Sequence, residues 1–290
     1  MLHFSLLFRA EGAKPPSGCR KEVSPSLPPA NGEPMSKLQT HLPDPKRAKG
    51  PYRPFTSDPG WNEAWWWLGL PVLAAAFTVG TFQFAPDWYE RYVMPEGYGI
   101  LEVAHFLIPL FGLLVAGSLL FLPFVRGRPL VFTVALLGAL SCLYIAGEEM
   151  SWGQHIFQWN TPDYWAMVNR QEETNLHNTY AVFEKIPRTI LEILIFGGGL
   201  LVPIAAVFYP WLRRCRLSLF LPAAALMPTA LGTMIFKLID RLYQAALVPA
   251  AVNRPSETVE TYLYFFIFAY LLVFARRIKE LEVAEGALPK

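Results

Sequence analysis

The sequence predicts an all-α membrane protein, a polytopic bundle of about six transmembrane helices preceded by a disordered N-terminal tail. Of its 290 residues, 53% are hydrophobic and 17% are charged, whereas charged residues make up about 25% of a typical soluble domain. The hydrophobic residues come in long runs, which is the pattern of membrane spans rather than of one soluble core. The formal net charge of only +2 gives no reason to expect a nucleic-acid partner.

Residues 1–60 differ in composition from the rest of the chain. They contain eleven prolines, many lysine, arginine, serine and glycine residues, and few aliphatic ones. Such a segment buries too little apolar surface to become ordered, so we expect a disordered cytoplasmic tail. Met35 is followed by a polar segment typical of a protein start. We expect translation to begin there, in which case residues 1–34 are not translated in vivo.

Six hydrophobic runs follow the tail within residues 61–280. Each is close to the roughly 20 residues that a helix needs to cross about 30 Å of hydrocarbon. A helix also satisfies its backbone hydrogen bonds internally, as lipid requires. We therefore expect six membrane-spanning helices. Their approximate ranges are 65–84, 100–124, 130–147, 190–212, 217–236 and 259–275.

Basic residues predict the orientation of these spans. The tail carries nine lysine or arginine residues, and the other basic clusters fall on the same side of the membrane if the chain crosses six times. The side richer in lysine and arginine faces the cytoplasm. We therefore expect both termini, including a C-terminal tail at 281–290, to be cytoplasmic in a bacterial inner membrane. The connection at 148–189 then forms an ordered outer loop, because long unstructured loops are uncommon.

Ionisable residues gather in the outer halves of the predicted spans, where they usually face a bundle interior or a wet cavity. Glu102 and His105 lie within one hydrophobic run, and their spacing of three places both on one helix face. Glu-x-x-His is the arrangement that di-metal carboxylate proteins use in helical bundles; a plain hydrogen bond between the two is the alternative. For Glu192, Glu260 and the group around Asp240, we expect charges that lie among lipid head groups.

The stretch that follows the third span is the richest in polar residues. As a continuation of that helix, it would place Glu148, Trp152 and His155 on one face, with Glu149 pointing elsewhere. Glu148 and His155 would then be roughly 10 Å apart along the helix axis, too far to share one ion. Either Gly153 breaks the helix or the two residues have different roles.

Two further features fall in the outer loop. Thr161 followed by Pro162 predicts a short helix with Thr161 as its N-cap. Glu173 and His177 come later. On a helix these two residues are four positions apart, and they could hold one metal ion together.

Two sequence blocks are joined by an aromatic loop: Glu-Glu-x-Ser-Trp-Gly-Gln at 148–154 and Asn-Leu-His-Asn at 175–178. Together they resemble a family of uncharacterised bacterial polytopic integral membrane proteins, over roughly residues 100–180. The resemblance implies a shared site on the outer face and brings no known activity with it. The chain departs from the family pattern at His155, where an arginine is expected. The resemblance therefore does not imply that His155 is an obligatory ligand.

These observations predict an inner-membrane protein with a site of histidine and carboxylate side chains open to the outer face. We expect a metal-dependent hydrolase using zinc or iron, in which a metal-bound water cleaves an ester or amide of a membrane lipid or another small amphiphile. The expected metal ligands are Glu102, His105, Glu148 and His177. The expected catalytic residues are Glu148, Glu149 and His177, and the expected supporting residues are Trp152, His155, Glu173, Asn175 and Asn178.

Two other classes of function stay open. A transporter, or a membrane protein that binds a solute or lipid, would use the same polar groups to bind cargo and relay protons. The nearly apolar inner halves of the spans argue against a path across the membrane. An accessory subunit of a membrane complex would instead use two histidines to hold haem.

Overall fold

The computed structural model describes residues 55–213, 215–248, 252 and 254–286. The predicted start at Met35, most of the predicted disordered tail and residues 287–290 lie outside this part. The last residues of the predicted tail, 55–60, are described, and Phe55 among them is buried.

All regular structure in the described residues is helical, which confirms the predicted all-α class. Six helical segments are long and apolar enough to cross a membrane, so the chain is a multi-pass membrane protein. These segments are Trp65–Phe84, Ile100–Leu119, Pro129–Glu149, Lys185–Phe208, Leu217–Gln244 and Pro255–Gly286.

Three spans are single α-helices and three are composite. The single ones are α3 (Ile100–Leu119), α5 (Pro129–Glu149) and α11 (Pro255–Gly286). The composite ones contain α1 (Leu70–Phe84), the series α8 (Ala181–Leu194), π-helical η6 (Ile195–Leu201) and α9 (Val202–Phe208), and α10 (Met227–Gln244). Short helices occupy the connections: α2 (Pro86–Trp88), α4 (Pro123–Arg126), α6 (Gln154–Phe157) and α7 (Asp163–Val168).

Prolines mark where two spans begin. Pro129 and Pro255 are the first residues of α5 and α11. A proline costs no hydrogen bond there, because the first N–H groups of a helix have no partner within it. Pro109 lies inside α3, and a membrane bundle tolerates it because neighbouring groups can satisfy the freed carbonyl.

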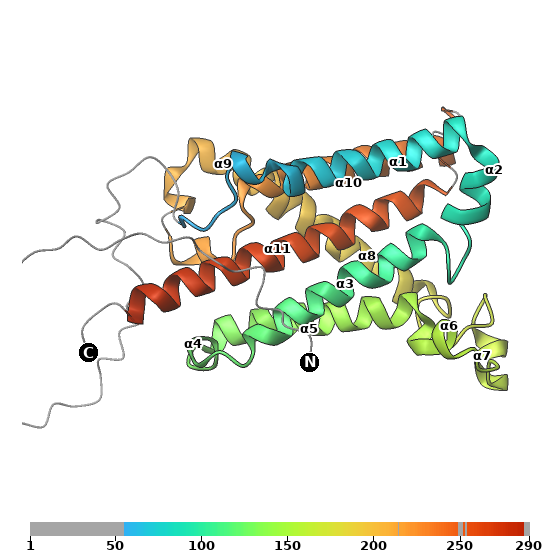
Figure 1. Ribbon diagram of the computed structural model, residues 1–290, viewed down its shortest axis with the longest axis horizontal. Helices are drawn as coiled ribbons and strands as arrows, with labels where there is room; N and C mark the ends of the chain where they lie inside the picture. Colours follow the sequence, from blue (N-terminus) through green and yellow to red (C-terminus); the bar gives the residue numbers. More distant parts are fainter. Residues whose placement is uncertain (1–54, 214, 249–251, 253, 287–290) are drawn as a thin grey trace, which may run out of the picture. The chain divides into compact units, whose positions relative to one another are not determined.

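Helix α11 packs against both α3 and α10, and α3 packs in turn against α5 (Figure 1). Small residues permit the close approach of α3 and α5: a Cβ atom added to Gly112 would lie 2.8 Å from the Cys142 sulfur. Leu271 of α11 is buried in the same cluster, with Ala116 and Ala139. Packing of small residues is the usual source of helix association in lipid.

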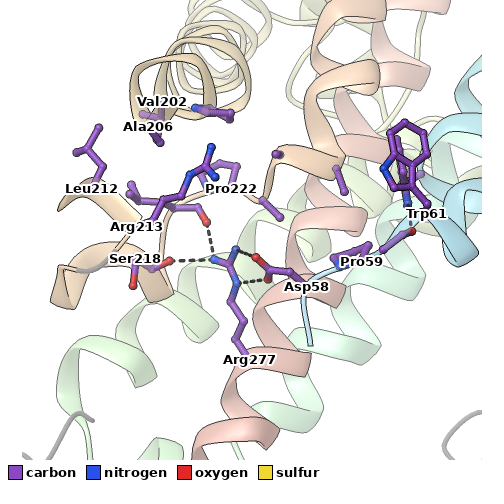
Figure 2. A pocket seen from close by; sticks show the side chains of 17 residues that line it. Asp58, Pro59, Trp61, Val202, Ala206, Leu212, Arg213, Ser218, Pro222 and Arg277 are labelled. Carbon is purple, nitrogen blue, oxygen red and sulfur yellow. Dashed lines mark hydrogen bonds and ion pairs between the residues drawn. The ribbon is translucent and has the colours of Figure 1, made fainter. Parts of the chain in front are cut away.

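The far end of α11 is held by Arg277, whose side chain is almost fully buried. Its guanidinium binds Asp58 through two contacts, Nε to Oδ1 at 2.6 Å and Nη2 to Oδ2 at 2.9 Å. Nη1 also donates to the carbonyls of Ser218 and Leu221, at 2.9 and 2.6 Å. Figure 2 shows this arrangement beside a small cavity of about 300 Å³. Arg277 thus ties two distant segments of the chain to α11.

The last two spans are longer than hydropathy predicts, and the fourth is shifted toward the N-terminus. The fourth covers 185–208 rather than 190–212, the fifth continues to 244 rather than 236, and the last covers 255–286 rather than 259–275. The added turns carry charged residues that pair within the protein, as Arg188 Nη1 does with Glu260 Oε1 at 2.6 Å. At the other end of α11, Leu281 is buried beside Phe55 and Ile278. Helix therefore continues through residues 281–286, which the sequence places in a tail.

Candidate functional site

A cavity of about 1150 Å³ lies where α5 and α10 end and α8 and α11 begin. This volume slightly exceeds the range of about 300–1,000 Å³ that is usual for small-molecule sites. Carboxylates outnumber basic side chains in its lining, nine to six, so the cavity favours a cation. The acidic residues are Glu96, Glu102, Glu148, Glu149, Glu173, Glu192, Asp240, Glu257 and Glu260, and the basic ones are Arg170, Lys185, Arg188, Lys237, Arg241 and Arg254.

His105 is fully buried beside this cavity, and its two ring nitrogens have different surroundings. Nε2 lies 2.8 Å from the hydroxyl of Thr261. Thr261 donates its own proton to the Glu257 carbonyl at 3.1 Å, so this network assigns the Nε2 proton to the bond with Thr261. Nδ1 makes no hydrogen bond among the described residues. The second nitrogen is thereby left to face the carboxylates.

Two carboxylates lie near that nitrogen. Nδ1 of His105 is 3.7 Å from Glu149 Oε2 and 3.8 Å from Glu257 Oε2. A neutral ring with its proton on Nε2 offers a lone pair at Nδ1, which is how histidine ligates a metal. A protonated ring would instead form an ion pair with these carboxylates. In both cases the arrangement requires a positive charge between the ring and the carboxylates, supplied either by a proton or by a metal ion.

Two groups of three residues in the described chain could hold a metal ion, and His105 belongs to both. One consists of Glu102, His105 and Glu257, and the other of His105, Glu149 and Glu260; within each group the ligand atoms lie within 4.8 Å of one another. Mixed histidine and carboxylate ligands suit zinc or iron. The predicted ligands Glu102 and His105 thus share a group, as their helical spacing requires.

The other carboxylates of these groups are bound by neighbouring side chains. Glu149 accepts a hydrogen bond of 2.7 Å from the Tyr264 hydroxyl. Glu260 is paired with Arg188, and Glu257 with Arg254 at 2.7 Å. Glu102 makes no hydrogen bond or ion pair with another described residue. Its oxygens are therefore the most available of the four carboxylates.

Glu148 has a different environment from Glu149. It accepts hydrogen bonds of 2.7 Å from the Trp152 indole and from the backbone N–H groups of Leu176 and His177. The His177 ring lies 3.3 Å from the same carboxylate. Burial lowers the pKa of His177, but the hydrogen bond to Glu148 and the negative charges of the nearby carboxylates together outweigh this effect, and the pKa is raised. Glu148 and His177 thus meet, as predicted, but neither belongs to the two groups above.

The chain does not continue as one helix beyond α5. Ser151 and Trp152 have φ of 45° and 53°, and Gly153 has φ of 105°, so α5 ends at Glu149 and the backbone turns. The break foreseen at Gly153 therefore occurs and begins two residues earlier. It brings Trp152 back against Gly147, where an added Cβ atom would lie 2.9 Å from the indole. Trp152 can then reach Glu148.

His155 binds Glu173 rather than any residue of the two metal groups. Its Nε2 lies 3.2 Å from Glu173 Oε1 and 3.0 Å from the Ser151 hydroxyl. Glu173 also accepts hydrogen bonds from Ser151 at 2.9 Å and from the Asn175 amide at 2.7 Å. These contacts fasten the outer loop to the end of α5. The hydrogen bond with Glu173 outweighs burial and raises the pKa of His155.

The expectation that Glu173 and His177 share one helix face is wrong. The residues between them form a loop, because the Asn169 side-chain oxygen accepts hydrogen bonds from the backbone N–H groups of Gln171 and Glu173, at 2.9 and 3.2 Å. Asparagine favours such turns over a helix. Asn178, another predicted supporting residue, donates its amide to Gln171.

Thr161 does not cap the next helix. Helix α7 begins at Asp163 and has Pro162 in the N-cap position. The Thr161 hydroxyl instead accepts a 2.7 Å hydrogen bond from Gln154 and donates to the Glu172 carbonyl. It therefore joins two parts of the outer loop.

Sequence reasoning missed Glu257 and undervalued Glu260, which was expected among the head groups. Hydropathy starts the last span at 259, whereas the helix begins at Pro255. The missed signal was spacing: Glu257, Glu260, Thr261 and Tyr264 follow an i, i+3, i+4, i+7 pattern, so all four lie on one helix face.

Comparisons of this chain with family models, with curated proteins and with solved structures found no match. The fold and the site therefore define the class on their own: a six-span membrane protein with histidine and carboxylate groups that could hold a metal ion. The resemblance to a bacterial membrane family stays a prediction.

Proposed function

We propose that the protein is a metal-dependent hydrolase of the bacterial inner membrane, with both termini cytoplasmic, which acts on a lipid or another amphiphile. The observation that carries the proposal is the Nδ1 atom of His105. It is fully buried, makes no hydrogen bond with another residue of the described part of the chain, and faces Glu149 and Glu257. A cluster of acids alone would be weak support, but a buried nitrogen donor aimed into the cluster is what a metal site requires.

Glu102, His105 and Glu257 are the proposed metal ligands. Glu102 is free of other partners among the described residues, and Thr261 fixes the ring of His105 through Nε2. A hydrogen bond at the second ring nitrogen is the usual way to orient a metal-bound histidine. A zinc or iron ion bound there would polarise a substrate carbonyl and acidify a water molecule.

Glu149 is the proposed general base. Its carboxylate lies next to His105, and the Tyr264 hydroxyl holds one of its oxygens. A carboxylate so placed accepts the proton of the attacking water and passes it to the leaving alcohol or amine. Glu148 and His177 hold the outer loop beside the cavity, through the bonds that Glu148 accepts.

The proposal is tested with full-length protein purified in detergent without chelator. We expect about one zinc or iron ion per chain and hydrolysis of a lipid ester or amide in mixed micelles. Glu149→Gln should keep the metal and lower the hydrolysis rate about 10²–10⁴-fold, the usual contribution of a general base. A wild-type protein without metal, or a Glu149→Gln variant with the full rate, would overturn the proposal.

One observation favours the transporter reading as a second candidate. Lys237 and Arg188 both contact Glu192, at 2.7 and 3.3 Å, and Arg188 reaches on to Glu260. Such a chain of charged groups suits proton relay or ion binding in a membrane. Absence of metal together with proton-coupled uptake in vesicles would favour this function over hydrolysis.

A further inference from the structure

The cavity is not uniform along its length. At one end it is lined by the carboxylates and basic groups described above, and from there it continues toward the middle of the bundle between α5, α8 and α11. This continuation, here called the groove, is almost entirely apolar. On α5 it is lined by Val134, Leu137, Gly138, Ser141 and Ile145, and on α11 by Leu263, Ile267, Tyr270 and Leu271.

The groove is deeper than one leaflet. Val134, its deepest lining residue on α5, and Glu149 are fifteen residues apart on one continuous helix, which corresponds to about 22 Å at 1.5 Å per residue. Half of a hydrocarbon core of about 30 Å is about 15 Å. The groove therefore extends from the carboxylates past the midplane, a length that suits a long hydrocarbon chain.

Leu271 of α11 contacts α5 in the deep part of the groove. A Cβ atom added to Gly138 would lie 2.8 Å from Leu271 Cδ2 and 3.7 Å from Ala116 Cβ, so the Leu271 side chain lies against the backbone of α5 there. Leu271 itself is buried. Gly138 and Leu271 thus form one wall of the deep part of the groove, whose lining continues to Val134.

The side of the groove is open between α5 and α8. Extensive helix packing in the described chain joins α5 to α3 and α8 to η6, and does not join α5 to α8. Both walls of this gap carry exposed apolar side chains, Leu137 on α5 and Ile190 and Leu194 on α8. In a membrane, such a gap faces the lipid chains of the leaflet nearer the outer loop.

We propose that the groove binds one long hydrocarbon chain of a membrane lipid, which enters sideways between α5 and α8 and places its polar head beside His105. The inference rests on the proposed function and narrows its substrate to a long-chain lipid drawn from that leaflet. The match is one of polarity as well as length. An apolar chain fills the apolar groove, and the head reaches the carboxylates and basic groups at its open end.

The change from an apolar lining to a polar open end argues against a helix as the occupant of the groove. A helix from a partner or from a second copy of this chain would have to be apolar beside Ser141 and strongly polar one or two turns farther on. It would also have to fit between α5 and α11 with a diameter of 10–12 Å including side chains. A single lipid has the required change of polarity in its own structure.

A matched pair of variants on α5 tests the groove. Ser141 lines the groove and is exposed, so Ser141→Phe should block the groove without disturbing the bundle. Leu143 is exposed at similar depth and does not line the cavity. The two positions lie about 200° apart around the helix, so Leu143→Phe is the control.

The probe is a long-chain phosphatidylcholine that carries a photoactivatable diazirine in one chain, mixed into vesicles of unlabelled phosphatidylcholine. Full-length protein is reconstituted, irradiated and digested, and adducts on 134–145 and 263–271 are compared with those on the lipid-facing residues of α1. We expect Ser141→Phe to lower the groove adducts about ten-fold relative to α1, the fold-change of about 1.4 kcal/mol. A free-energy cost of about 1.4 kcal/mol lies within the range of about 1–3 kcal/mol that is typical when extra atoms are forced into an occupied space. Leu143→Phe should leave the ratio unchanged.

Metal content, measured on the same preparations, separates the two proposals. Groove adducts lost in Ser141→Phe with no metal in any preparation would support lipid binding and reject the metalloenzyme. Metal present with a groove ratio equal in all three proteins would reject the groove and leave the metal site standing. Wild-type groove adducts no more frequent than those on α1, in a protein whose mass is that of a dimer, would assign the face to a second copy instead.

Discussion

Replacement of His105 by glutamine is the sharpest test of the candidate metal centre. His105 belongs to both groups of possible ligands and supplies the nitrogen of each. Glutamine has a similar size and keeps a hydrogen-bonding side chain next to Thr261, so the fully buried position stays filled. The substitution therefore removes the ligand more than it disturbs the packing.

The size of the expected effect follows from the geometry. Two carboxylate charges 4.8 Å apart, the outer limit within each group, repel each other by about 3.5 kcal/mol at an effective dielectric constant of about 20. The carboxylates therefore need a cation, and the nitrogen donor determines whether a metal ion can compete with protons for that place. Loss of a residue that only supports a ligand costs 10–100-fold in metal affinity. Loss of the donor itself should cost at least about 100-fold, or about 2.7 kcal/mol.

The assay is metal per chain by elemental analysis, followed by titration with zinc or iron in competition with a chelator. His177→Gln is an informative comparison, because the sequence predicts His177 as a ligand whereas neither three-residue group contains it. We expect His177→Gln to keep the metal and His105→Gln to lose it. Equal metal affinity in wild type and His105→Gln would refute the reasoning. Loss of metal in both would restore the ligand set predicted from the sequence.

Three further predictions concern stability. Arg277→Met should lower the free energy of unfolding by about 3 kcal/mol, the lower end of the range for a broken buried pair, because it leaves the partly buried carboxylate of Asp58 unpaired; a change below about 1 kcal/mol in thermal denaturation in detergent would contradict this. Burial raises the pKa of Glu173, but its bonds, chiefly from His155, outweigh this and lower it, while the pKa of His155 is raised. The contribution of Glu173 is lost as pH falls through its lowered pKa, and that of His155 is lost as pH rises through its raised pKa. Hydrogen exchange in the outer loop, corrected for the intrinsic effect of pH, should therefore be slowest between the two, and the same profile in His155→Asn would exclude this pair as the cause. Gly153→Ala should destabilise the protein by about 1–3 kcal/mol, because φ is 105° there. Gly80 lies in a helix with open space around it, so Gly80→Ala should stabilise the protein by up to about 1 kcal/mol. Shifts of the melting temperature with the same sign in both variants would refute this contrast.

The six spans and the pairing of Glu102 with His105 could be predicted because both depend on local pattern. Hydrophobic runs of about 20 residues predict membrane helices, and a spacing of three places two side chains on one face. Local spacing places the polar residues of the last span on one helix face, but it could not show that this face lies beside His105. Glu257 lies before the hydrophobic run of the last span, and its place beside His105 depends on how α11 packs against α3.

The outer loop shows a different limit of sequence reasoning. Ser151 and Trp152 adopt positive φ without being glycine, and no local preference predicts this for a bulky residue. They are held there by a local bond from Trp152 to Glu148 and by a long-range bond from the Thr174 hydroxyl to the Ser151 carbonyl. The asparagine turn at Asn169 is local, by contrast, and could have been read from the sequence in place of a helix.

Helix α11 carries Glu257 and Tyr264 near one end and Arg277 near the other. Because the helix is continuous, the directions in which these side chains point around its axis are fixed relative to each other. A residue inserted between Tyr264 and Arg277 would turn one end by about 100° relative to the other. Either the carboxylates would leave the cavity or the guanidinium would lose Asp58. No loop interrupts α11 to absorb such a change, so its length is under a constraint that the composition of its residues does not reveal.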